Sequence, residues 1–112
     1  MPHCIIEFSN DLNTHIKETV KMVTVDIENS GLFDKRTIKT RAISIDNYLV
    51  GGTEDSFIHV TVKMLEGRSG VQKKELSQRI LSSVMKLYDI ENISVEIMDL
   101  HTYSYSKKEI LK

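Results

Sequence analysis

The sequence is poor in the residues that cross-link or interrupt small folds, with one Cys, one Pro and no Trp among 112 residues. One Cys excludes an internal disulfide framework and any zinc site built from several cysteines. Cys4 lies in a predicted strand, and we interpret it as a small buried apolar residue rather than a nucleophile. No apolar run approaches the ~20 residues of a membrane-spanning helix, and Met1–Asn10 has no secretory signal. We therefore expect a cytoplasmic protein with no membrane partner.

An excess of charge of one sign is also missing, since 15 Lys and Arg oppose 16 Asp and Glu. Nucleic-acid-binding domains usually carry a basic surplus, so this class of partner is disfavoured. The four His residues lack the spacing of zinc ligands, and there is no glycine-rich phosphate-binding loop. With 40% hydrophobic residues, the chain can build one core, and its length fits a single domain over residues 1–112.

Hydrophobic patterning predicts four strands and two helices. Runs rich in alternating or β-branched residues predict strands at 4–8, 37–46, 56–65 and 92–98. Helical spacing relates two sets of apolar residues, Leu12, Ile16, Val20, Val23 and Ile27, then Leu76, Ile80, Val84 and Leu87. We expect the first helix to be capped by residues 9–11 and to stop at Gly31. Ser69 and Gln72 predict a capping box at the start of the second helix.

This order of elements predicts an α+β fold of two β-α-β units, in residues 1–50 and 51–100, followed by a C-terminal tail. The strands within each unit should be parallel, because a helix crossover joins them. Two such units form a four-stranded mixed sheet with both helices on one face. The other face, which carries residues such as Ile5, is left bare, and this favours self-association.

Pro2 is a candidate general base. Initiator Met is commonly removed before Pro, which would leave a secondary amine at the N-terminus. A reference α-amino group has a pKa of ~7.7–8.0, and burial or nearby cations lower that pKa toward neutrality. Such an amine can accept a proton at neutral pH. Many chains begin with Met-Pro without using the amine, so this feature alone does not assign a function.

Three cations could surround that amine. Arg68 lies between the third predicted strand and the second helix, where a guanidinium and a helix N-terminus together favour a carboxylate. Lys39 and Arg41 share one face of the second strand. Each is also compatible with an ordinary solvated side chain. If the third strand runs antiparallel to the first, however, all three converge with Pro2 at one end of the sheet.

Several segments of the chain resemble, in order, the 5-carboxymethyl-2-hydroxymuconate Δ-isomerase family of the tautomerase superfamily. They are residues 1–9 (MPHCIIEFS), 31–33 (GLF), 38–41 (IKTR), 57–63 (FIHVTVK) and 67–69 (GRS). The similarity covers nearly the whole chain to about Met98. It implies a tautomerase-like fold assembled as a homotrimer, an N-terminal proline base at Pro2, and substrate binding by Arg68. It also implies a pair of basic residues at positions 39 and 41, where Lys39 replaces an Arg of the family's pair.

The resemblance further implies a cofactor-independent isomerase, with neither metal nor organic cofactor. Its substrate would be an unsaturated, carboxylated 2-hydroxy or 2-oxo acid, such as 5-carboxymethyl-2-hydroxymuconate in aromatic (homoprotocatechuate) catabolism. Two alternatives stay open. One is a tautomerase of simpler 2-oxo acids, because Lys39 cannot make the two parallel hydrogen bonds to a carboxylate that Arg makes, which weakens the binding of several carboxylates. The other is a non-enzymatic oligomer that binds a small anion or a protein; an ordinary pKa of the N-terminal amine would favour it.

Overall fold

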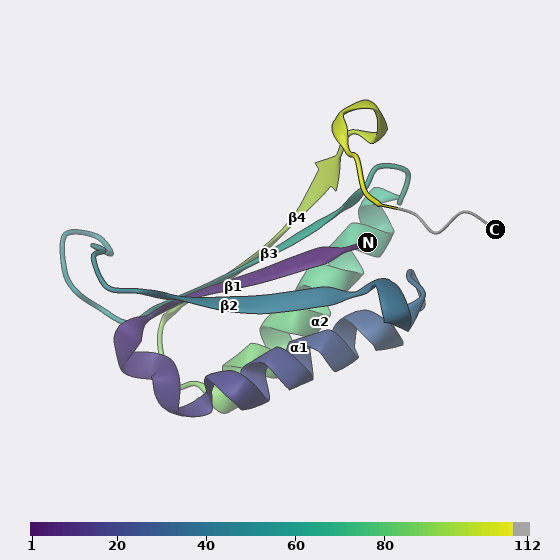
Figure 1. The fold of residues 1–112 in the computed structure, drawn as a ribbon. Coiled ribbons are helices and arrows are strands. Elements are labelled where there is room, and N and C mark those ends of the chain that lie inside the picture. The colour runs from purple at the N-terminus through teal and green to yellow at the C-terminus, as the bar shows by residue number, and fades with distance from the viewer. Residues whose placement is uncertain (109–112) are drawn as a thin grey trace.

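The computed structural model describes residues 1–108 and shows one four-stranded sheet with both helices packed on the same face (Figure 1). The strands are β1 (His3–Ser9), β2 (Lys39–Ile45), β3 (Phe57–Leu65) and β4 (Asn92–Leu100), and the helices are α1 (Ile16–Asn29) and α2 (Gly70–Leu87). The sheet order is β2-β1-β3-β4. β1 pairs in parallel with β2, β3 pairs in parallel with β4, and the central pair β1–β3 is antiparallel. The predicted mixed sheet of two β-α-β units is confirmed.

The core lies between the sheet and the helices, and strand parity decides which residues enter it. The even-numbered residues of β1 and β3 point toward the helices and are buried, namely Cys4, Ile6, Phe8, Ile58, Val60, Val62 and Met64. The helices contribute the buried residues Val23, Ile27, Leu76, Ile80 and Val84. Full burial of such a side chain stabilises the fold by roughly 1.5–3 kcal/mol. No helix within residues 1–108 is long and apolar enough to cross a membrane.

The start of the first helix differs from the prediction. Residues Asn10–His15 form a 3-10 segment, η1, and α1 begins only at Ile16. Ser9 makes no capping hydrogen bond, because its Oγ accepts instead from the Phe57 N–H at 3.1 Å. The Asp11 carboxylate accepts a hydrogen bond from the Ser56 hydroxyl. The side-chain oxygens of Ser9 and Asp11, which we expected to cap the helix, therefore bind the start of β3 instead.

Other element boundaries follow the local sequence signals. α1 ends before Gly31, which has a φ of 73°, and the predicted capping box of Ser69 and Gln72 is present with both of its hydrogen bonds. β4 extends two residues beyond the predicted end at Met98. Between β2 and β3 the chain projects away from the sheet as a loop whose tip, at Gly51 and Gly52, closes a two-residue hairpin (Figure 1).

The face of the sheet opposite the helices is mainly polar. By register it carries the odd-numbered residues of β1, β2 and β3 and the even-numbered residues of β4. His59 hydrogen-bonds Ser94 at 2.6 Å and Glu96 at 2.9 Å across this face. Ile43 and Met98 are each 43% exposed on it. In residues 1–108 no helix covers this face, as the sequence predicts.

We expect Ser69→Ala to lower the free energy of unfolding by about 1 kcal/mol, because the Gln72 N–H loses its capping acceptor. Urea unfolding at one fixed protein concentration measures the change. Ser82→Ala, at an exposed position inside α2, is the matched control and should leave stability equal or slightly higher, since Ala favours helix. Equal destabilisation by both substitutions would contradict a role for the cap.

Candidate active site

The N-terminal residues are fixed to the start of β2 at one end of the sheet. The Met1 ammonium donates to the Thr37 carbonyl at 2.7 Å, and the Lys39 N–H donates to the Pro2 carbonyl at 3.1 Å. The Pro2 side chain is fully buried. The N-terminus lies at the end of the sheet where β3 ends and β2 begins (Figure 1). The backbone around Pro2 is therefore held on both sides.

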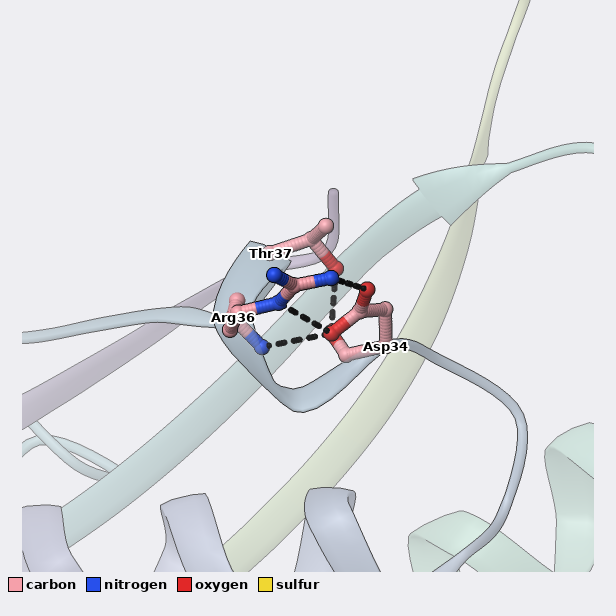
Figure 2. Close-up of polar contacts among 3 residues, drawn as sticks. All are labelled: Asp34, Arg36 and Thr37. Atoms are coloured by element: carbon pink, nitrogen blue, oxygen red, sulfur yellow. Dashed lines mark hydrogen bonds and ion pairs between the residues drawn. The ribbon is translucent and has the colours of Figure 1, made fainter.

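A short 3-10 turn, η2 (Lys35–Thr37), presents the Thr37 carbonyl to the N-terminus. Asp34 caps this turn by accepting from the Arg36 N–H at 3.0 Å, and the Arg36 side chain returns to the same carboxylate at 3.0 and 3.3 Å (Figure 2). These hydrogen bonds from Arg36 lower the pKa of Asp34. Asp34, the carboxylate whose charge acts on the N-terminal amine, is thus kept ionised and is already paired with Arg36.

Arg68 reaches the same end of the molecule from the loop between β3 and α2. Gly67 has a φ of 125°, a backbone conformation that residues other than glycine rarely adopt, and the chain turns there after the strand. The half-buried Arg68 side chain donates from Nη2 to the Leu32 carbonyl at 2.8 Å. Its guanidinium carbon lies 4.8 Å from the centroid of the Phe33 ring, within range of a cation–π interaction. The connection between α1 and β2 thus orients Arg68.

Burial and neighbouring cations lower the pKa of the Met1 amine from 8.0 to about 6. Burial has the largest effect, followed by the charges of Lys39, Lys107 and Arg68, and Asp34 acts in the opposite direction. An amine with this pKa is largely unprotonated at pH 7 and can accept a proton. Lys39 and Arg68 both act on the N-terminus, so the structure brings these two predicted cations to the same place.

Arg41 lies farther along β2, opposite Ile5, and contacts the N-terminal strand through a different residue. Its Nη1 lies 3.2 Å from Nδ1 of His3, and Nε2 of His3 lies 2.8 Å from the hydroxyl of Tyr105. Sequence patterning gave no functional role to His3 or Tyr105. His3 shares strand parity with Lys39 and Arg41, a usable signal, whereas Tyr105 follows the last predicted strand and carries no such signal.

Cys4 is fully buried in the core, which confirms the prediction that it is a small buried apolar residue. Burial raises the pKa of its thiol to about 12. It therefore stays protonated and is not a nucleophile at neutral pH. Across residues 1–108, His, Cys, Asp and Glu form no group of three or more able to hold a metal ion.

Comparisons with known proteins give one family and one fold. The family described as 5-carboxymethyl-2-hydroxymuconate isomerase matches residues 2–109. A 5-carboxymethyl-2-hydroxymuconate isomerase from Deinococcus radiodurans R1 has the same fold, with a TM-score of 0.83, 22% identity, and coverage of 97% of this chain and 90% of that one. A macrophage migration inhibitory factor-like protein from Entamoeba histolytica has a TM-score of 0.77 at 19% identity, covering 96% and 95%. A fused 4-OT in a symmetric trimer has a TM-score of 0.82 at 13% identity, covering 97% and 94%. A search of curated proteins gives no match.

In protein that retains Met1, we expect the α-amine to titrate with a pKa of about 6. Lys39→Met should raise this pKa, because a cation that disfavours the ammonium is lost; Lys86→Met, at the distant end of α2, should not. The pH dependence of N-terminal acylation, followed by mass spectrometry, measures both.

The same pKa shift predicts how stability depends on pH. Since the folded amine binds its proton more weakly than the unfolded one, its contribution to the free energy of unfolding should rise between pH 6 and pH 8. An ordinary pKa in the parent protein would contradict the electrostatic description.

Proposed function

The chain belongs to the 5-carboxymethyl-2-hydroxymuconate isomerase family, and we propose that, once Met1 is removed, the Pro2 amine is its general base. The observation that carries this proposal is the low pKa, about 6, of the amine at this end of the sheet. The Pro2 nitrogen lies one residue farther along the same segment, Pro2 is fully buried, and its carbonyl accepts from the Lys39 N–H, so in this proposal burial and the nearby cations lower the pKa of the Pro2 amine as well. A secondary amine there is available as a base at neutral pH.

The proposed reaction moves one proton within the substrate. The Pro2 nitrogen accepts a proton from the dienol or an allylic position of an unsaturated 2-hydroxy acid and becomes a secondary ammonium. The electron pair left on the substrate is delocalised as a dienolate. The ammonium then returns the proton at another carbon, which gives the conjugated ketone and restores the free amine. The proton is conserved and no electrons leave the substrate, so the base and its cations account for the chemistry without a cofactor.

The cations supply binding and charge stabilisation in this proposal. Arg68 offers a planar guanidinium fixed against Leu32 and Phe33, while Arg41 and Lys39 extend along the neighbouring strand. Fixed positive groups stabilise the negative charge that develops on the dienolate oxygen, because they need no reorganisation as it forms. Several cations at one end of the sheet also suit a substrate with several carboxylates. We therefore propose 5-carboxymethyl-2-hydroxymuconate as the substrate.

We propose that residues 1–112 form one domain and that three copies assemble. Two observations support the assembly. The sheet face opposite the helices carries the partly exposed Ile43 and Met98, and a fused 4-OT of the same fold is a symmetric trimer. Most soluble homo-oligomers have closed symmetry, and a ring of three identical subunits is one such arrangement. The site would then lie near a subunit boundary.

A tautomerase of simpler 2-oxo acids is the second candidate, and Lys39 is the observation that favours it. Its ammonium already donates to the Thr37 carbonyl at 3.1 Å, and a Lys cannot make the two parallel hydrogen bonds of an Arg–carboxylate pair. Comparing kcat/KM for mono-, di- and tricarboxylated dienols separates the candidates. A preference for the tricarboxylate supports 5-carboxymethyl-2-hydroxymuconate, and a preference for the monocarboxylate supports the simpler substrate.

Blocking the Pro2 amine should abolish most of the activity. In protein that retains Met1 the Pro2 nitrogen is an amide, and we expect kcat to fall by roughly 100-fold or more, the usual contribution of a positioned base. Mass spectrometry establishes the N-terminus of each preparation, and the processed chain is the control. Retaining Met1 puts a different amine of low pKa, that of Met1, at the N-terminus, so an N-acetylated Met1 preparation is measured in parallel. Undiminished activity of the acetylated protein would overturn the mechanism.

Arg68→Ala should lower kcat/KM for a dicarboxylated substrate by roughly 10- to 100-fold, the range expected when one charged hydrogen-bonding partner is lost. Arg79→Ala, at an exposed position within α2, is the matched control and should leave kcat/KM unchanged. Steady-state kinetics with both variants tests the assignment. Equal values for Arg68→Ala and the parent protein would remove Arg68 from the site.

A further inference from the structure

The segment after β4 folds back across the end of the sheet that holds the N-terminus. The Glu66 N–H donates to the Leu100 carbonyl at 3.1 Å, and the Glu66 carboxylate accepts from the Thr102 N–H at 2.9 Å. A 3-10 turn, η3 (Thr102–Ser104), then reverses the chain. The yellow segment beyond it runs down toward the N-terminus in Figure 1. Two contacts with the β3–α2 connection thus hold this return segment in place.

Tyr105 is the side chain through which the return segment reaches the sheet. Its hydroxyl lies 2.8 Å from Nε2 of His3, and the two rings meet edge-on with centroids 6.0 Å apart. Tyr105 is half-buried, whereas Tyr103, two residues earlier, is fully exposed. The two tyrosines of one short segment therefore provide a contact and an internal control.

The direction of the hydrogen bonds follows from Arg41. A guanidinium only donates, so Nδ1 of His3, 3.2 Å from Nη1 of Arg41, must be the acceptor. His3 is then neutral with its proton on Nε2, and this N–H donates to the Tyr105 oxygen. Burial first, and then the charges of Arg41 and Lys39, lower the pKa of His3, which agrees with a neutral ring. The three side chains form one directed chain, from Arg41 through His3 to Tyr105.

We infer that Tyr105 is a positioning residue, which fixes the Arg41 guanidinium through His3 for a substrate carboxylate. Without the tyrosine oxygen, the Nε2–H of His3 has no acceptor from this segment, and the ring is no longer held in the tautomer that accepts from Arg41. Arg41 then loses the His3 Nδ1 acceptor that orients its guanidinium. This inference rests on the proposed function, because it assigns Arg41 to substrate binding.

The first test reads the tautomer directly and does not depend on activity. Nitrogen-15 chemical shifts of the His3 ring should show Nδ1 unprotonated and Nε2 protonated in the parent protein and in Tyr103→Phe. In Tyr105→Phe the preference for this tautomer should weaken. A ring protonated at Nδ1 in the parent protein, or the same tautomer preference in Tyr105→Phe, would overturn the inference whether or not the proposed isomerase activity is found.

The second test is kinetic and uses a double-mutant cycle. Tyr105→Phe should raise KM for a dicarboxylated substrate by roughly twofold to tenfold, with a smaller change in kcat, because one hydrogen bond that orients a binding group is lost. The same substitution should have no further effect on KM in an Arg41→Ala background and its full effect in an Arg68→Ala background. An equal effect of Tyr105→Phe in both backgrounds, or none in the parent, would overturn the inference. The Pro2-blocked protein separately tests the proposed function.

Discussion

The antiparallel pairing of β1 with β3 is the constraint on which the arrangement of the site depends. Because β1 and β2 are parallel, Pro2, directly before β1, and Lys39, the first residue of β2, lie at one end of the sheet. Because β3 runs the other way, its last residue leads into Gly67 and Arg68 at that same end. A parallel central pair would put Arg68 at the far end. One choice of strand direction therefore brings an amine and a guanidinium together from residues more than sixty positions apart.

Concentrating positive charge at this end has a cost in stability that local contacts offset. The Phe33 ring and the Leu32 carbonyl hold Arg68, and the Thr37 carbonyl accepts a hydrogen bond from the Lys39 ammonium. These acceptors are neutral. They orient cations without cancelling their charge, which preserves the field that lowers the pKa of the N-terminal amine. A carboxylate in the same place would stabilise the cations better and would also restore the basicity of the amine.

Much of the fold can be predicted from the sequence because its signals are local or strictly periodic. Strand parity, the Ser69–Gln72 capping box and the stop at Gly31 each depend on a few adjacent residues. The start of α1 could not be predicted, since Ser9 is used by Phe57, 48 positions away in the chain. Within the candidate site, Lys39 and Arg68 follow from strand direction. The contact between His3 and Tyr105 does not, because these residues are 102 positions apart and meet only through the return path of the chain after β4.

The contact between His3 and Tyr105 bears on where the protein tolerates additions. His3 and Tyr105 touch, so residues near both ends of the described chain meet in the candidate site. The hairpin at Gly51 and Gly52 projects from the opposite end of the sheet (Figure 1), and the residues at its tip are exposed. Exposed hairpin tips of this kind accept inserted sequence readily. A fluorophore, an affinity tag or a surface anchor therefore belongs there, in the middle of the sequence.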